Sequence, residues 1–256
     1  MRRFQDVLLA CIPFAIIFLA WQLLSLYGGF PEKLVPNLGQ IGQTFVRLAS
    51  EGILWGAAKS TLYRLLLGFL ISGLVGVMIG ILMGRHKAVE DVLLPLISFV
   101  YPIPGIAYAP LFVLWFGLGD MPAILLIAFA STFIVIMNTW KGVKSVKQVW
   151  IKSAEIMGAK STDIFWRIVL PGALPFILSG LRLGLASAWR ILVAVEMLMS
   201  VKVGLGWMIF GSQTFLNTDV MLATIALIGL IGVILEKQIF EQIERRTVIR
   251  WGMVKG

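Results

Sequence analysis

The chain has 256 residues, of which 59% are hydrophobic and only 14% are charged, and its mean hydropathy is +0.93. A soluble domain of this size carries about 25% charged residues and about 45–50% apolar ones. The apolar residues form long uninterrupted runs, which indicate contact with lipid rather than an amphipathic surface facing water. The formal charge of +9 comes without a visible soluble domain, so we expect no nucleic-acid partner.

The single cysteine, Cys11, and the single histidine, His86, exclude an internal disulfide and any metal site built on clusters of these residues. Leu8-Leu9-Ala10-Cys11 is similar to a lipoprotein processing site. A signal segment, however, has its apolar region before the cleavage site, and here the apolar run continues past Cys11 to Tyr27. We therefore expect a plain thiol at Cys11, either facing lipid or packed between helices, and no metal site.

Six segments are candidates for membrane-spanning helices, since a span needs roughly 20 apolar residues. In chain order they are residues 7–27, 65–84, 92–119, 121–140, 175–201 and 220–235. The third contains four prolines, which predict a broken or kinked helix, the fifth carries charges and the sixth is short. The predicted fold class is an all-α polytopic membrane protein with six transmembrane helices in a single domain over residues 1–256.

The distribution of Lys and Arg predicts the orientation. With a cytoplasmic N-terminus, fifteen of the 22 basic residues fall in cytoplasmic segments and five, including Lys59 and Arg64, in extracytoplasmic ones. This positive-inside bias predicts that both termini are cytoplasmic in a multi-pass protein of the inner membrane. It makes residues 28–64 an extracytoplasmic segment, with a short amphipathic surface helix over 41–48, and residues 141–171 a cytoplasmic loop.

Residues 141–171 have the pattern of two helices joined by a bend. Apolar residues recur at spacings of three and four and predict a helix over 146–157: Val146, Val149, Trp150, Ala154 and Met157. Gly158 suits a left-handed helix end, Ser161 suits the N-cap of a second helix, and Asp163 in its first turn favours the helix dipole. The pattern alone leaves open a simple loop lying on the membrane surface.

The run Ser153-Ala154-Glu155-Ile156-Met157-Gly158-Ala159, followed by Ile168-Val169-Leu170-Pro171, resembles the "EAA" loop of ABC importer permeases. Lys152 and Ser153 stand where that family has Glu and Ala, so the acidic start of the motif is absent. The resemblance implies a type I ABC importer permease fold whose loop carries a coupling helix that seats in a cleft of a cytoplasmic ATPase. The implied ATPase contacts are Ala154, Glu155, Met157, Gly158, Ala159, Lys160, Asp163 and Pro171.

A second resemblance is to the nitrate/sulfonate/taurine group of these permeases. It rests on Tyr101-Pro102-Ile103-Pro104-Gly105 with the following run to Gly119, on Glu196 followed by Gly204-Leu205-Gly206-Trp207, and on the tail from Leu235 to Arg246. It implies that the chain forms the translocation path for a small anionic solute, such as nitrate, an alkanesulfonate, taurine or bicarbonate. The same group also includes carriers of aromatic acids and vitamin precursors.

The partners follow from the resemblance: a second copy of the chain forming a homodimeric pore, two cytoplasmic ABC ATPase subunits, an extracytoplasmic solute-binding protein, and membrane lipid. The sequence contains no Gly-x-x-x-x-Gly-Lys-Ser/Thr loop that could hold ATP phosphates. We therefore expect a non-catalytic subunit with no cofactor of its own, and ATP and Mg²⁺ bound by the partner ATPase.

Six residues are candidates for the translocation path or its gate: Tyr101, Pro102, Pro104, Tyr108, Arg190 and Glu196. Carbonyls freed by proline are tolerated in a bilayer where they line a cavity or pack against protein, so a packed structural kink is the alternative. A charge inside a span costs roughly 2.5–3.5 kcal/mol and needs a partner or a wet cavity. Six positions separate Arg190 from Glu196, so they do not share a helix face, and each needs a partner across the dimer axis or in the solute path. We hypothesise that Arg190 attracts the anion and Glu196 fixes the gate, with a structural charge network as the alternative.

Two other classes of membrane protein are alternatives to the importer permease. An ion-coupled secondary transporter predicts inverted repeats and discontinuous helices. The broken third span fits that class, but no matching broken helix is visible in the other half. A structural or assembly protein of the membrane leaves the motif around Gly158 unexplained.

Overall fold

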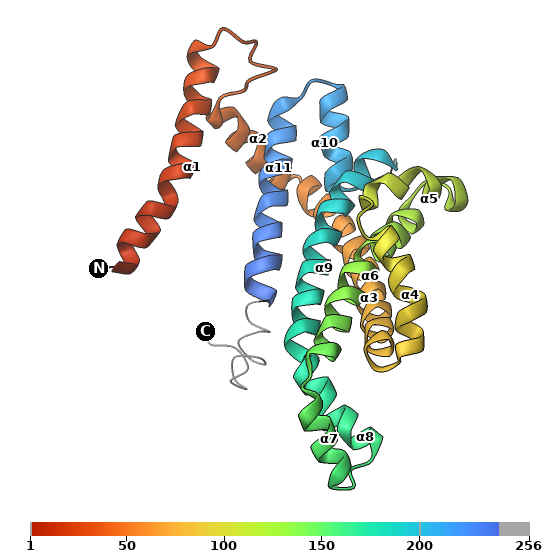
Figure 1. The fold of residues 1–256 in the computed structure, drawn as a ribbon. Coiled ribbons are helices and arrows are strands. Elements are labelled where there is room, and N and C mark those ends of the chain that lie inside the picture. Colours follow the sequence, from red (N-terminus) through yellow and green to blue (C-terminus); the bar gives the residue numbers. More distant parts are fainter. Residues whose placement is uncertain (1, 200, 241–256) are drawn as a thin grey trace. The chain divides into compact units, whose positions relative to one another are not determined.

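The computed structural model describes residues 2–199 and 201–240, and these are α-helical with short connections (Figure 1). The side chains of residues 2–11 and 238–240 are outside the description, so the expectation for Cys11 and the similarity of the tail beyond Phe240 are not addressed. The helices are α1 (Arg2–Tyr27), α2 (Leu38–Ser50), α3 (Ile53–Arg85), α4 (Lys87–Val100), η1 (Gly105–Tyr108), α5 (Ala109–Phe116), α6 (Asp120–Ser145), α7 (Gln148–Ile156), α8 (Ser161–Ile164), η2 (Phe165–Val169), α9 (Leu170–Leu198), α10 (Leu205–Thr214), α11 (Thr218–Val233) and η3 (Ile234–Phe240).

The all-α class of the prediction is confirmed, and most of the predicted spans have counterparts. Four helices are long and apolar enough to cross a membrane: Ile53–Arg85, Asp120–Ser145, Ser161–Leu198 and Thr218–Lys237. Lys87–Val100 and Gly105–Phe116 pass the same test together and are bent by 89° at the break between them. The predicted first span lies in α1, of which Ile12–Tyr27 is a shorter apolar stretch.

The bend confirms the prediction of a broken third span and has a local cause. Pro102 and Pro104 lie between α4 and η1, where the helical hydrogen-bond ladder stops. Proline has no N–H to continue that ladder, and its ring disfavours helical geometry in the residue before it. The helical path therefore breaks at these prolines and resumes after Pro104 with the short 3-10 helix η1, which leads into α5.

Some predicted boundaries are wrong. α3 begins at Ile53 and not at Leu65, because Lys59 and Arg64 are accommodated within the helix rather than in an extracytoplasmic connection. The surface helix predicted over 41–48 is longer, and α10 was not predicted at all.

Contacts divide the chain into two compact units, Met1–Ser60 with Val203–Gly229, and Thr61–Lys202 with Leu230–Gly256. In the first unit, the segment between α1 and α2 is held by hydrogen bonds to α1. Trp21 Nε1 donates to the carbonyl of Pro36 at 2.9 Å, and the Leu38 N–H donates to Gln22 Oε1 at 3.0 Å. A capping box between Asn37 and Gln40 then fixes the start of α2.

In the second unit, α3, α6 and α9 run alongside one another (Figure 1), with glycines at their closest approaches. Gly76, Gly80 and Gly84 of α3 recur every four residues and face α6. A Cβ built on each would lie 2.5–2.6 Å from the nearest side-chain atom of Val135, Thr139 or Val143. Small residues with this spacing let helix backbones approach closely in a membrane, where packing rather than hydrophobicity drives helix association.

We expect Gly80→Ala to destabilise the protein by about 1–3 kcal/mol, the usual cost of overpacking, although Ala is the better helix former. Its Cβ would meet Thr139 Cβ at 2.6 Å and the Ile136 carbonyl oxygen at 2.9 Å. Gly56→Ala in the same helix is the matched control, since nothing lies within 4 Å of its added Cβ. Thermal unfolding in detergent should rank Gly80→Ala below the wild type and Gly56→Ala at or above it. Equal effects of the two changes would contradict close packing at Gly80.

Candidate coupling elbow and translocation path

The elbow is formed by α7, the turn at Gly158 and α8, and it projects from the ends of α6 and α9 (Figure 1). α7 ends in a Schellman motif: the N–H of Ala159 bonds the carbonyl of Ala154 at 3.0 Å, and the N–H of Gly158 bonds that of Glu155 at 2.9 Å. Gly158 has φ of +79°, a left-handed conformation that glycine adopts without strain. The predicted helix end at Gly158 is therefore confirmed.

Two details of the predicted elbow differ. α7 begins at Gln148, so Val146 lies before it, buried at the end of α6. Ser161 is the first residue of α8, and Lys160 holds the N-cap position without a side-chain cap bond. Asp163 does lie in the first turn of α8. The helix then passes through the π-helical segment η2 directly before Pro171, where the missing proline N–H would otherwise interrupt a regular α-helix.

The inner face of the elbow is anchored to the rest of its unit. Ala154, Ala159 and Phe165 pack against a buried cluster that includes Val169 and Ala173. The Arg85 guanidinium at the end of α3 lies 4.8 Å from the centroid of the Phe165 ring, within cation–π range, and its Nη2 lies 3.3 Å from Ser161 Oγ. These contacts give the elbow a fixed base on the ends of α3, α6 and α9.

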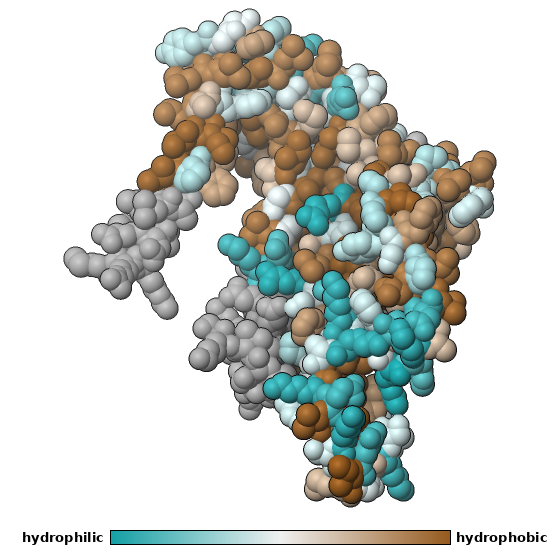
Figure 2. Space-filling view, viewed as in Figure 1, coloured by the Kyte–Doolittle hydropathy of each residue, from teal (hydrophilic) through white to brown (hydrophobic). Residues whose placement is uncertain are grey.

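The outer face of the elbow carries large apolar side chains that the described part of the chain leaves exposed. Ile156 and Met157 are 87% and 85% exposed, and Val149, Trp150 and Trp166 are also exposed. In Figure 2, apolar residues at the tip of this projection stand among hydrophilic ones. An exposed apolar patch with a polar rim is typical of an interaction surface.

The eight predicted ATPase contacts do not all lie on the exposed face. Ala154 and Ala159 pack inward and support the bend, Glu155, Met157, Gly158, Lys160 and Asp163 lie at the turn or in α8, and Pro171 is the second residue of α9. Glu155, Met157, Gly158 and Lys160 are exposed, while Asp163 and Pro171 are half-buried. Their contact with an ATPase stays a prediction.

Four of the predicted path residues lie around one cavity of about 280 Å³ at the bend between α4 and η1. Tyr101, Pro102, Pro104 and Tyr108 form one wall of it. The opposite side includes Phe129, Phe133 and Ala130 of α6 and Ser187 and Ile191 of α9. Gly105 allows this wall to approach α6 and α9 closely, because a Cβ at this position would lie only 2.6 Å from Ala130 Cβ and 2.9 Å from Ile191 Cδ1.

The structure does not bring Arg190 into that cavity. Arg190 is exposed and lines a separate hollow of about 110 Å³ with Arg182, Trp189, Gly232 and Glu236. Arg182 Nη2 lies 3.7 Å from Glu236 Oε1 at the edge of this hollow. The six predicted path residues therefore occupy three places rather than one.

Glu196, the sixth, lies in a buried ion cluster. Its side chain is fully buried, and its Oε1 is 2.5 Å from Nη1 of Arg64, itself 3% exposed. Thr61 Oγ1 lies 2.9 and 3.0 Å from the two carboxylate oxygens of Glu196. On the other side of the guanidinium, Arg64 Nε and Nη2 contact Asp120 Oδ1 at 2.8 and 2.7 Å.

The cluster corrects the prediction for Glu196. Its described partners, Arg64 and Thr61, come from α3 of the same chain, whereas the sequence analysis expected a partner across a dimer axis or in the solute path; Asp120 of α6 joins the cluster through Arg64, and the gate role of Glu196 stays a prediction. Arg64, assigned to an extracytoplasmic connection, is a buried residue of α3. The sequence feature that could have indicated this cluster is an arginine directly before a long uncharged run, together with one carboxylate in another predicted span.

Residues 76–248 match the family described as "Binding-protein-dependent transport system inner membrane component". The chain is 37% identical over 237 residues to the taurine transport system permease protein of Escherichia coli (strain K12), an alignment that covers 91% of this chain and 86% of that protein. It is 31% identical over 188 residues to the bicarbonate transport system permease protein of Synechococcus elongatus, covering 73% and 67% of the two chains.

Among solved structures, an amino acid ABC transporter with histidines has a TM-score of 0.65 at 17% identity, covering 78% of this chain and 97% of that one. That likeness shows the shared fold. Family membership decides between the alternatives raised by the sequence, in favour of an importer permease over a secondary transporter or an assembly protein. The chain belongs to the binding-protein-dependent transport system inner membrane component family: it is the non-catalytic inner-membrane permease subunit of an ABC importer, whose partners are a separate ATPase and a solute-binding protein.

Proposed function

We propose that two copies of this chain form the translocation pore, that two ATPase subunits dock on the elbows around Gly158, and that both termini are cytoplasmic. The observation that carries the proposal is the exposed apolar tip of an otherwise anchored elbow, at Ile156 and Met157. In this arrangement ATP and Mg²⁺ bind in the ATPase, and nucleotide-driven closure moves the elbows. Because their inner faces pack on α6 and α9, that movement is transmitted to the membrane helices.

We propose a small anionic solute, delivered by the binding protein. The relatives named for taurine and bicarbonate support this class, since both solutes carry an anionic oxygen group. The cavity at Tyr101 and Tyr108 is the proposed passage, because a broken helix exposes backbone carbonyls that only a lined cavity or packed protein tolerates. Arg190, exposed in a separate hollow of the same unit, is proposed to raise the local anion concentration.

Uptake by proteoliposomes tests this proposal. They would contain this chain with the ATPase and binding protein encoded beside it, and the solute found bound to that binding protein would be the labelled substrate. We expect uptake to require ATP. Arg190→Ala should raise the Michaelis constant, because removing a cation outside the passage weakens the attraction of an anion and leaves the ATP-driven step unchanged. Normal transport by Arg190→Ala with an unchanged Michaelis constant would remove the anion role of Arg190.

A further inference from the structure

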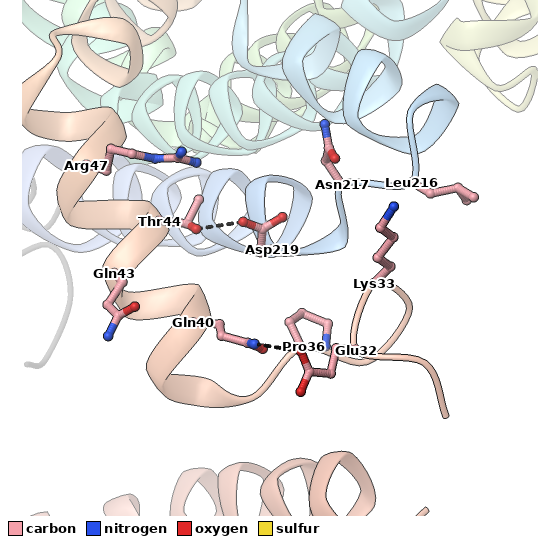
Figure 3. Close-up of a pocket in the computed structure, with 10 residues that line it drawn as sticks. All are labelled: Glu32, Lys33, Pro36, Gln40, Gln43, Thr44, Arg47, Leu216, Asn217 and Asp219. Atoms are coloured by element: carbon pink, nitrogen blue, oxygen red, sulfur yellow. Dashed lines mark hydrogen bonds between the residues drawn. The ribbon is translucent and has the colours of Figure 1, made fainter. Parts of the chain in front are cut away.

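A polar cavity of about 420 Å³ lies within the first unit, between the segment before α2, α2 itself and the turn from α10 to α11 (Figure 3). It is separate from the residues proposed for the solute path. Charged and amide side chains dominate its lining: Glu32, Lys33, Gln40, Gln43, Arg47, Asn217 and Asp219. Such a density of polar groups around one hollow suits a polar ligand rather than a lipid chain.

The cavity has two positive and two negative groups, which balance. Lys33 and Arg47 are the cations, and Glu32 and Asp219 are the carboxylates. Among residues 12–199 and 201–237, whose side chains the structure describes, no ion pair within 4.0 Å involves any of the four. In Figure 3, Arg47 extends from α2 and Lys33 from the segment before α2, so the two cations approach the hollow from different elements.

The carboxylates are held by neutral donors and remain able to accept more hydrogen bonds. Asp219 Oδ2 accepts from Thr44 Oγ1 at 2.6 Å, and Glu32 Oε2 accepts from Gln40 Nε2 at 3.4 Å. An ionised carboxylate has about four lone-pair sites, so each retains capacity for a cationic donor. The Thr44 bond also joins α2 to the start of α11, two elements far apart in sequence.

The walls of the cavity are fixed at two points. The capping box of Asn37 and Gln40 sets the start of α2 on one side. On the other side, Leu216 has φ of +56°, a left-handed conformation that is unfavourable for a residue with a side chain. Strained backbone of this kind persists where the surroundings hold it, and it concentrates at ligand sites.

We propose that this cavity binds a small zwitterion, with its anionic oxygen group between Lys33 and Arg47 and its ammonium group against Asp219 and Glu32. A bare anion would meet two carboxylates there, and a bare cation would meet two basic groups. A ligand carrying both charges satisfies both pairs, and the opposing charges discriminate against single-charge analogues. A free aminosulfonate and a zwitterionic phospholipid headgroup share this chemistry.

The test uses the full chain in nanodiscs of dioleoylphosphatidylglycerol, which has no ammonium group, with labelled taurine as the probe in equilibrium dialysis. We expect saturable binding of taurine, and binding about tenfold weaker or more for isethionate and ethylamine, which each lack one charge. Arg47→Gln and Asp219→Asn should each weaken taurine binding by about tenfold. Asn at position 219 keeps an acceptor for Thr44, which protects the fold. Lys59→Gln, an exposed cation of α3 outside the cavity lining, should leave binding unchanged.

A second set of nanodiscs, containing dioleoylphosphatidylethanolamine, separates the two sources of the zwitterion. Loss of taurine binding in these discs identifies a lipid headgroup as the occupant, and retention identifies a soluble zwitterion. Both outcomes support the proposal. It is overturned if taurine shows no saturable binding in phosphatidylglycerol discs, if isethionate binds equally well, or if Arg47→Gln and Asp219→Asn change nothing. These dialysis experiments measure binding without ATP-driven transport, so their result is independent of the proposed coupling elbow and solute path.

Discussion

Replacing Gly158 with Val should abolish most of the solute-stimulated ATP hydrolysis of the assembled transporter while the chain still inserts and folds. Gly158 has φ of +79°, and no atom lies within 4 Å of an added Cβ, so the obstacle is backbone conformation and not space. A left-handed residue with a side chain costs about 1–2 kcal/mol, and a β-branched one is a genuine outlier there. The Schellman motif should therefore open, and the exposed tip at Ile156 and Met157 should move relative to its base.

Gly158→Asn is the matched control, because Asn tolerates the left-handed region far better than Val. Hydrolysis is measured on proteoliposomes with the binding protein and solute present, and we expect a loss of at least about tenfold for Val, which corresponds to about 1.4 kcal/mol. The Asn variant should keep most of the activity. Full activity of Gly158→Val would show that the elbow geometry is unimportant for coupling.

Breaking the buried ion cluster should have the largest effect on stability. Glu196→Ala leaves the Arg64 guanidinium, 3% exposed, with Asp120 as its remaining carboxylate among the contacts described above. Removing one partner of a buried pair typically costs about 3–5 kcal/mol. Because the exposed Asp120 still compensates part of the Arg64 charge, we expect the lower end of this range, about 3 kcal/mol. We therefore expect a clear drop in the thermal unfolding midpoint of the purified chain in detergent.

Two further variants serve as controls for this prediction. The double change Arg64→Leu with Glu196→Leu should recover much of the lost stability, since a buried pair replaced by apolar residues is often neutral. Arg182, also on α9, forms a longer ion pair of 3.7 Å with Glu236 of η3, and the side chains of Arg182 and Glu236 are 37% and 59% exposed. Arg182→Ala removes the cation of this pair. A partly exposed pair contributes about 0–1 kcal/mol, so the midpoint should change little. A Glu196→Ala midpoint equal to that of Arg182→Ala would mean that the cluster does not hold α3, α6 and α9 together.

The sequence is most informative where a single local rule decides the structure. Long apolar runs predict α6, α9 and α11 because hydrocarbon forces every backbone group to bond within its own helix. Gly158 predicts a helix end because few other residues adopt its conformation, and Pro102 with Pro104 predicts a break for lack of a backbone donor.

Prediction fails where the structure depends on contacts between distant residues. Arg64 has the pattern of a flanking charge because nothing near it in sequence shows that Glu196 and Asp120 come within 3 Å of it. Its burial is possible only after three helices have packed. The sequence could not place Arg190 relative to Tyr101 either, since that depends on which side of α9 faces the cavity. The polar cavity around Arg47 and Asp219 combines segments more than 150 residues apart in sequence, and no local pattern indicates it.

Photo-crosslinking from position 157 tests the coupling elbow most directly. Met157 is 85% exposed at the tip, and Leu114 of α5 is an equally apolar control, 79% exposed, within the bent span. With a photoreactive residue at each site in intact membranes, position 157 should crosslink the ATPase subunit, with a yield that changes on adding ATP. Position 114 should crosslink lipid or membrane protein and give no ATPase adduct. Lipid adducts alone from position 157, with no ATPase product, would contradict the assignment of this elbow as the coupling surface.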